Sequence, residues 1–214
     1  SAIASGAGDA YVVDDTTFTA SVGKRSMTID SSRLRIKGQH NLYNAMAAVL
    51  ATLAAGVDEA QIERSLYDFE AIEHRLEPVG KRDDIEYIND SKATNVDSAW
   101  YALESMTRPT VWIVGGTDKG SSYAPLFDLA KKKVHTLICM GVDNARLEKE
   151  FSGVVPNIIS CHTFEDAMQA VVRSARKGDT VLLSPACASF DLFKNYEHRG
   201  REFKAWVNKN ILSK

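Results

Sequence analysis

The chain has 214 residues, which is enough for one large domain or two small ones with a hydrophobic core. Hydrophobic residues make up 44% and charged residues 25% of it, as in an ordinary globular protein. With a formal charge of only −2, net charge alone does not attract the chain to nucleic acid or to anionic lipid.

The first 70 residues predict a small antiparallel sheet followed by two helices. Residues 10–37 alternate short β-branched and polar stretches separated by Asp, Ser and Gly, which predicts the sheet. From residue 39, apolar residues recur at helical spacing as far as Gly56, where a helix would stop. Asp58, three residues before Gln61, predicts the N-cap of a second helix.

From residue 85 onwards, short apolar runs alternate with helical patterns. The predicted strands are 85–89, 111–114, 135–140, 157–160 and 180–183. The predicted helices lie near 95–105, 123–133, 143–151, 163–176 and 198–210, with Thr163 as an N-cap, Gly178 as a C-terminal stop and basic residues 131–133 in a last turn. This rhythm predicts an α/β, Rossmann-like fold whose mainly parallel sheet has helices on both faces. A domain boundary is expected after residue 74, which gives parts 1–74 and 75–214.

Three polar loops follow predicted strands. They are "INDSKATNVDS" at 88–98, "GGTDKGSS" at 115–122 and "SPACASFDLFKNYEHRG" at 184–200. Each supplies hydroxyl groups and a cation, and the carboxyl ends of parallel strands meet at one edge of a sheet. Hydroxyls, lysines and backbone amides gathered at one edge predict a crevice that binds a carboxylate or a phosphate.

Each loop also has a simpler interpretation. "GGTDKGSS" fits an ordinary glycine-rich turn and lacks the Walker A spacing, whereas "DSKATN" fits a helix cap made by Thr94 or Asn95. Residues 197–199 fit a solvated helix face. Cys187 fits a buried thiol better than a nucleophile, and the three cysteines and five histidines show no metal-ligand spacing.

Five stretches, in this order, resemble one family. "GQHNLYNAMAA", "HRLE", "YINDSKATN", "VGGTDKG" and "LLSPACASFDLFKNYEHRG" resemble the Mur ligases of peptidoglycan synthesis, and within them the branch that adds D-glutamate. The resemblance runs from about residue 30 to the last residue. It implies that 1–74 is the C-terminal part of the central ATP-binding domain and that 75–214 is the Rossmann-like, amino-acid-binding domain.

The resemblance implies an ATP-dependent ligase that joins D-glutamate to UDP-N-acetylmuramoyl-L-alanine through an acyl phosphate. ATP and Mg²⁺ would be its cofactors. The family's P-loop, modified lysine and magnesium ligands would lie upstream of this chain, so we expect no metal site here and no activity from these 214 residues alone. A cytoplasmic monomer that acts on small molecules, without nucleic-acid or membrane partners, is expected.

The resemblance also implies roles for individual residues. Arg75 and Lys92 would be catalytic, close to the reacting phosphate and carboxylate. The residues that would bind ATP are Asn41, Asn44, Arg75 and Asp90, and those that would bind D-glutamate are Thr94, Lys119, Ser189, Phe190 and Tyr196. Leucine and phenylalanine are usual in the family where this chain has Phe190 and Tyr196.

Two other functional classes are alternatives to the ligase. A non-catalytic Rossmann-like module would bind a nucleotide or an acid without ligation. A dinucleotide-dependent oxidoreductase is disfavoured, because no Gly-x-Gly-x-x-Gly follows a strand with an acidic residue about 20 positions later.

Overall fold

The computed structural model describes residues 3–5, 8–36, 38–69 and 72–213. The chain divides into two compact units, Ser1–Ala71 and Ile72–Lys214. The boundary predicted from the sequence lies after residue 74, and the assignment of the two parts to particular domains stays a prediction.

The first unit is an antiparallel sheet with two helices. Its strands, β1 (Ile3–Ser5), β2 (Gly8–Asp14), β3 (Thr17–Val22) and β4 (Arg25–Asp30), pair in chain order. Alternate residues of β3 and β4 are buried under α1 (Gln39–Ala54), and α2 (Glu59–Asp68) follows. Asp58 caps α2, because its carboxylate accepts a hydrogen bond from the Gln61 amide at 3.2 Å. The predicted sheet, helices and cap are therefore confirmed, and β1 extends the sheet beyond the predicted range.

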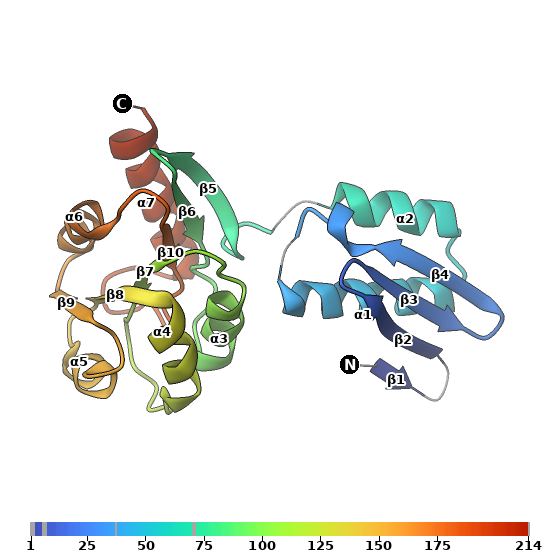
Figure 1. Ribbon diagram of the computed structural model, residues 1–214, viewed down its shortest axis with the longest axis horizontal. Helices are drawn as coiled ribbons and strands as arrows, with labels where there is room; N and C mark the ends of the chain where they lie inside the picture. Colours follow the sequence, from blue (N-terminus) through green and yellow to red (C-terminus); the bar gives the residue numbers. More distant parts are fainter. Residues whose placement is uncertain (1–2, 6–7, 37, 70–71, 214) are drawn as a thin grey trace. The chain divides into compact units, whose positions relative to one another are not determined.

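The second unit has a six-stranded sheet in the order β5-β6-β10-β7-β8-β9 (Figure 1). Its strands are β5 (Glu77–Arg82), β6 (Ile85–Asn89), β7 (Thr110–Val114), β8 (Val134–Met140), β9 (Asn157–Cys161) and β10 (Thr180–Leu183). All neighbours are parallel except β5, which pairs antiparallel with β6. The sequence missed β5 because Pro78 and Gly80 interrupt it. An edge strand tolerates both, and its register shifts between them.

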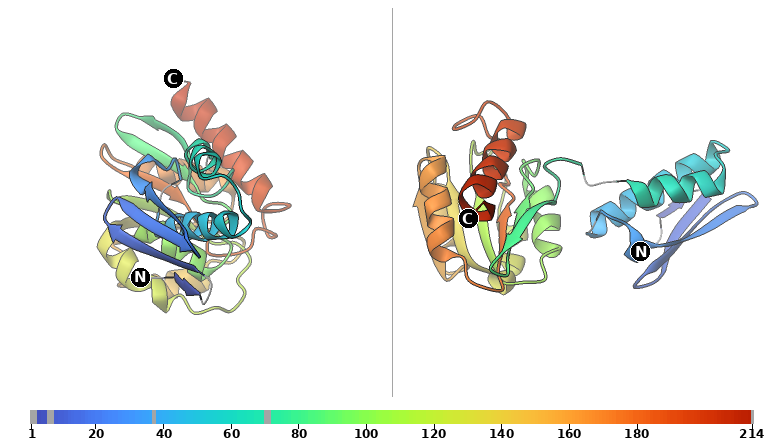
Figure 2. Two further views of the ribbon diagram at one scale, coloured as in Figure 1. Left: turned by 90° about the vertical axis from the view of Figure 1, so that its right-hand side faces the viewer. Right: turned by 90° about the horizontal axis from the view of Figure 1, so that it is seen from above.

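Helices cover both faces of this sheet (Figures 1 and 2). Trp112 and Val114 of β7 pack with α3 (Val96–Glu104), α4 (Phe127–Lys133) and α5 (Ala145–Phe151). Val111 and Ile113 point to the other face, where α6 (Phe164–Ser174) and α7 (Tyr196–Val207) pack. This alternation of buried residues confirms the predicted fold class, since a strand covered on both sides is apolar throughout.

The predicted helix ends are partly confirmed. Thr163 caps α6 by accepting from the Asp166 amide, and three lysines end α4. Gly178 does not cap α6, which ends at Ser174. It lies in a later turn with a φ of 97°, where the Asp179 carboxylate accepts from the Arg176 amide.

Gly200, inside α7, marks the closest approach of this helix to the sheet. A Cβ atom at this position would lie 2.2 Å from Nδ1 of the buried His74 ring and 3.1 Å from Nδ2 of Asn89. Glycine normally weakens a helix interior, so its presence here reflects the space that His74 takes.

We expect Gly200→Ala to lower the free energy of unfolding of the second unit by about 1–3 kcal/mol, because the added methyl overpacks the contact with His74. Helix propensity alone predicts the opposite sign. Urea unfolding of the chain measures the difference. Arg201→Ala, at the exposed neighbouring position, is the control. If the Gly200 variant were as stable as the control, the close approach would be wrong.

Candidate functional site

The polar loops of the second unit meet at the carboxyl edge of its sheet. β10 lies between β6 and β7, with Leu183 in register with both Asn89 and Ile113. The three loops predicted to converge therefore leave adjacent strands at the same edge. β5 runs the other way, so the turn before it, residues 73–76, comes to this edge too.

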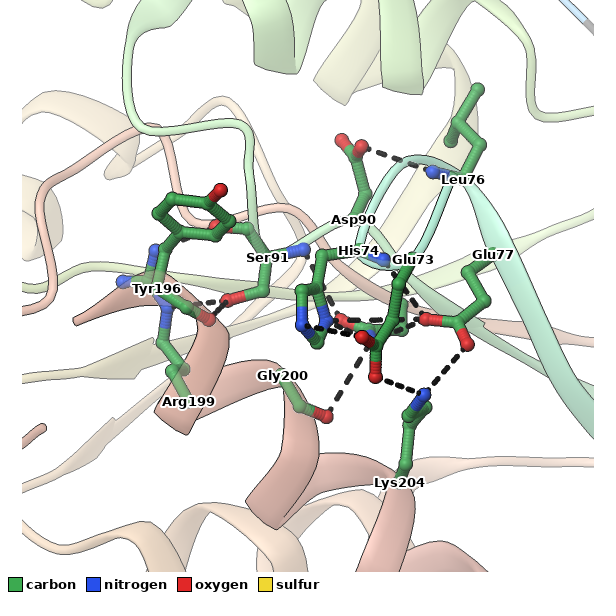
Figure 3. A network of polar contacts seen from close by, with 11 residues as sticks. Glu73, His74, Leu76, Glu77, Asp90, Ser91, Tyr196, Arg199, Gly200 and Lys204 are labelled. Carbon is green, nitrogen blue, oxygen red and sulfur yellow. Dashed lines mark hydrogen bonds and ion pairs between the residues drawn. The ribbon is translucent and has the colours of Figure 1, made fainter. Parts of the chain in front are cut away.

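Asp90 joins three of these segments. Its amide donates to the Leu183 carbonyl at 2.8 Å, and its carboxyl oxygens accept from the Leu76 amide at 3.1 Å and the Ser184 hydroxyl at 2.8 Å. Figure 3 shows the bond to Leu76. Burial raises the pKa of Asp90 to about 7, against the opposing effect of both hydrogen bonds. The carboxyl group is therefore a structural tie as well as the predicted acceptor for a ribose.

Arg199 ties the loop after β6 to the loop after β10. Its guanidinium, in a side chain that is fully buried, donates to the carbonyl and hydroxyl of Ser91 at 2.9 and 3.0 Å, and to the Cys187 carbonyl at 3.3 Å. The Ser91 hydroxyl in turn donates to the Tyr196 carbonyl at 2.8 Å (Figure 3). No carboxylate among the described residues pairs with Arg199, and burial lowers its pKa to about 10.

A solvated helix face at residues 197–199 is thus wrong for Arg199. The sequence did contain a signal for its burial, because Arg199, Phe203 and Val207 recur every four residues and share one face of α7. The run of three charged or polar residues at 197–199 suggested a solvent-exposed face instead.

His74 fixes the turn that carries Arg75. Its ring is buried, Nδ1 accepts from Asn89 Nδ2 at 3.0 Å, and burial lowers its pKa. Glu77 accepts from the amide of His74 and from Nδ2 of Asn89, both at 2.9 Å, and the Lys204 ammonium pairs with Glu77 at 2.8 Å (Figure 3). The residues on either side of Arg75 have positive φ, 69° at His74 and 42° at Leu76. The network therefore holds a conformation that few side chains adopt freely.

Three predicted site residues at this edge are cations without an ion pair. Within the described chain, Arg75, Lys92 and Lys119 have no carboxylate within ion-pair distance, and Nε of Arg75 is buried without a hydrogen-bond partner. The Lys92 ammonium lies 5.5 Å from the centre of the Tyr196 ring. Arg108 differs from these three cations, because it is paired with both Asp84 and Glu86. The edge therefore keeps positive charge available for an anionic ligand.

We call the carboxyl edge of the sheet, with the polar loops that meet there, the rim. Its remaining predicted site residues lie on the loops after β6 and β10 and at the start of α7. Asn95, and not Thr94, caps α3 by accepting from the Ser98 amide at 2.8 Å, which leaves the Thr94 hydroxyl without a partner among the described side chains. Ser189 is buried, whereas its neighbour Phe190 is 72% exposed. The Tyr196 ring stands edge-on to His74, with centroids 6.0 Å apart.

Asn41 and Asn44 belong to the first unit, on the first two turns of α1. Asn44 lines an apolar pocket of about 460 Å³ between α1 and α2. Ile36, Ala48, Leu66 and Phe69 are among its other lining residues. A mainly apolar pocket of this volume, with the side-chain amides of Asn44 and Gln61 on its wall, has the size and composition of a site for a small flat ligand.

The other candidate chemistry is weaker. The Cys187 thiol is buried 3.0 Å from the Tyr123 hydroxyl, and burial raises its pKa, so it is an inert core thiol. No group of three His, Cys, Asp or Glu side chains in the described ranges is arranged to hold a metal ion. None of the described helices is both long and apolar enough to cross a bilayer.

The fold and the rim together define a Rossmann-like domain that carries unpaired cations at the carboxyl edge of its sheet. The family described as Mur ligase, glutamate ligase domain, matches residues 74–187. The chain belongs to the Mur ligase family.

Two curated relatives share one name. The chain is 45% identical over 195 residues to the UDP-N-acetylmuramoylalanine–D-glutamate ligase of Christiangramia forsetii. This match covers 91% of this chain and 44% of that protein. The chain is 48% identical over 181 residues to the ligase of the same name from Cytophaga hutchinsonii, with 85% and 40% covered. The chain therefore spans less than half the length of these relatives.

Solved structures share the fold. MurC from Thermotoga maritima matches with a TM-score of 0.67 at 17% identity, over 93% of this chain and 44% of that one. FolC from E. coli, in complex with DHPP and ADP, matches with a TM-score of 0.66 at 18% identity, over 95% and 47%. At such identities the likeness extends to the fold alone.

The raised pKa of Asp90 leads to a pH-dependent stability. The carboxyl of Asp90 is protonated below about pH 7 in the folded chain, whereas it ionises near pH 3.8 in the unfolded chain. Its protonated form therefore contributes fully to the stability of the fold below pH 3.8, and this contribution is lost as the pH rises through 7. The full loss is on the order of 4 kcal/mol. We expect the stability of the chain relative to its Asp90→Asn variant to fall between pH 5 and pH 8. The ¹³C carboxyl shift of Asp90 should titrate near pH 7, and a midpoint near 4 would contradict the assignment.

Proposed function

We propose that this chain is the amino-acid-binding part of an ATP-dependent ligase that joins D-glutamate to UDP-N-acetylmuramoyl-L-alanine in peptidoglycan synthesis. The observation that carries the proposal is the group of unpaired cations at the rim, Arg75, Lys92 and Lys119, in a member of the Mur ligase family. The name of the curated relatives supports the choice of D-glutamate over other amino acids.

Amide synthesis from a carboxylate requires activation, because the negative charge repels a nucleophile and oxide is a poor leaving group. ATP supplies that activation when its γ-phosphate passes to the L-alanyl carboxylate, which gives an acyl phosphate. Phosphoryl transfer depends on positioning and on neutralising charge, so it requires cations and no protein nucleophile. Arg75 suits the phosphate because its planar fork bonds two oxygens at once, and Lys92 would lie beside the reacting groups.

D-glutamate has two carboxylates and one amine that must reach the acyl phosphate. We assign its carboxylates to Lys119, Ser189 and Thr94, with help from the Phe190 backbone and Tyr196. The exposed ammonium of Lys119 and the unpartnered hydroxyl of Thr94 support this assignment. Holding both acids in place removes much of the entropic barrier to a bimolecular step, up to about 7–11 kcal/mol in favourable cases.

We assign the adenine of ATP to the neighbourhood of Asn41 and Asn44, and its ribose to Asp90. The apolar pocket beside Asn44 supports the first assignment. The Asp90 carboxyl retains lone pairs beyond the two already used, as the second assignment requires. Following the family resemblance, we place Mg²⁺ on residues outside this chain. The proposed enzyme acts on small molecules in the cytoplasm as a monomer, without nucleic-acid or membrane partners.

Lys119→Ala and Ser189→Ala, made in the full-length ligase, should raise the KM for D-glutamate by at least roughly tenfold, because each removes a charge-assisted or buried hydrogen bond to the ligand. The KM for ATP should change by less than about twofold, since neither residue is assigned to the nucleotide. Steady-state kinetics with each substrate varied in turn measures both constants. Lys149→Ala, on an exposed position of α5, is the control. Equal losses for the two substrates would contradict the assignment.

The 214 residues alone should not hydrolyse ATP or form the amide, because the proposed nucleotide site is completed by residues outside this chain. A coupled assay of phosphate release, with the full-length ligase as the positive control, measures this. Turnover by the isolated chain would refute the proposed division of the site.

A further inference from the structure

We propose that Arg146, on α5, is a positioning residue that holds Lys119 where the D-glutamate carboxylate binds. The inference rests on the proposed function and assigns a role to a residue outside the set described above. Its basis is the way in which the loop after β7 is attached to the rest of the domain.

The loop after β7 is fixed by backbone bonds only at its start. The Gly115 amide donates to the Pro185 carbonyl and the Thr117 amide to the Ala188 carbonyl, both at 2.9 Å. Residues 117–122 are exposed, and in the described chain no backbone hydrogen bond ties residues 118–122 to another segment. Lys119 therefore sits on a stretch that neither burial nor the sheet holds in place.

The guanidinium of Arg146 grips this stretch on both sides of Lys119. One terminal nitrogen donates to Asp118 Oδ2 at 2.6 Å, and the other donates to the Ser121 carbonyl at 2.7 Å. Nε donates to Glu150 Oε1 at 2.7 Å, one turn further along α5, which fixes the direction of the fork. Each of the three guanidinium nitrogens thus has an acceptor, which fixes the orientation of this planar group.

Two further contacts add to this clamp, which consists of Arg146, Asp118 and the Ser121 carbonyl, and the second contact leads to the neighbouring loop. The Gly120 amide donates to Asp118 Oδ1 at 2.9 Å, which closes a tight turn around Lys119. The Arg146 guanidinium lies 5.2 Å from the centre of the Tyr123 ring, whose hydroxyl is 3.0 Å from the Cys187 thiol. Cys187 precedes Ser189 by two residues, so the clamp relates the positions of the two proposed D-glutamate ligands.

Arg146 acts through geometry and adds no positive charge to the rim, because Asp118 and Glu150 together outweigh its own charge. A lysine at this position would keep the charge but could not reach the Asp118 carboxylate, the Ser121 carbonyl and the Glu150 carboxylate at once. The two substitutions Arg146→Lys and Arg146→Met therefore separate the fork from the charge.

In the full-length ligase, Arg146→Met and Arg146→Lys should each raise the KM for D-glutamate by roughly tenfold or more, because a displaced Lys119 meets its ligand out of position. The kcat at saturating D-glutamate and the KM for ATP should stay within about twofold of the wild type. Lys149→Met, on an exposed position of the same helix, should match the wild type. Asp118→Asn, which retains an acceptor for the Gly120 amide and weakens the grip of Arg146, should shift the D-glutamate KM in the same direction.

Hydrogen exchange of the Gly120 amide, measured on the 214-residue chain, gives a readout that does not depend on the reaction. It should be roughly tenfold faster in Arg146→Met and unchanged in Lys149→Met. A wild-type D-glutamate KM in Arg146→Lys, or unchanged exchange in Arg146→Met, would overturn the inference while Lys119→Ala still impairs D-glutamate use. If Lys119→Ala itself left that KM unchanged, the proposed function of the loop would fail, and the inference with it.

Discussion

The geometry of the rim depends on one buried guanidinium that has no carboxylate partner among the residues that the structure describes. Taking the charge of Arg199 out of water is costly, and the bonds to Ser91 and the Cys187 carbonyl offset that cost only if both loops stay in place. The loops after β6 and β10 are therefore held together by a group that loses several hydrogen bonds at once when either loop moves. Since carbonyl and hydroxyl oxygens leave its charge unneutralised, the same group contributes a positive potential to the edge where an anion would bind.

Asp90 complements this arrangement, because it also joins the segments after β6 and β10. Burial drives Asp90 towards its neutral form and lowers the pKa of Arg199, while the two groups attract one another electrostatically. A phosphate or carboxylate that binds nearby would favour the protonated form of Asp90 further, because like charges disfavour ionisation. Ligand binding and the protonation of this carboxyl are thus coupled. Because the protonated carboxyl of Asp90 carries no charge, it does not neutralise the cations of the rim, and these can interact with the ligand.

The sequence predicted what local patterns encode. Apolar runs located the five parallel strands, and the rule that ligands gather at their carboxyl ends predicted that the three loops converge. It missed β5, whose proline and glycine only an edge position allows. The sequence did not predict the contact of His74 with Gly200, and it left open a solvent-exposed Arg199. Both features depend on packing between residues far apart in the chain. At Asn95 the cap was one of two residues that the sequence left open, and backbone geometry decided between them.

The three loops of the rim are held by forces of different strength, and this has a consequence for how the site can work. Buried bonds of Asp90 and Arg199 fix the loops after β6 and β10, and such bonds are lost only at a cost comparable to local unfolding. The loop after β7 depends on partly exposed ion pairs of Arg146, and exposed pairs contribute about 0–1 kcal/mol each and weaken with salt. Its ordering free energy is therefore small enough for a ligand carboxylate on Lys119 to supply, so the loop that makes the most exposed contact is also the one best able to adjust to the ligand. A rigid pair of loops beside one adjustable loop gives the domain fixed positions for the reacting groups and tolerance in how the incoming amino acid enters.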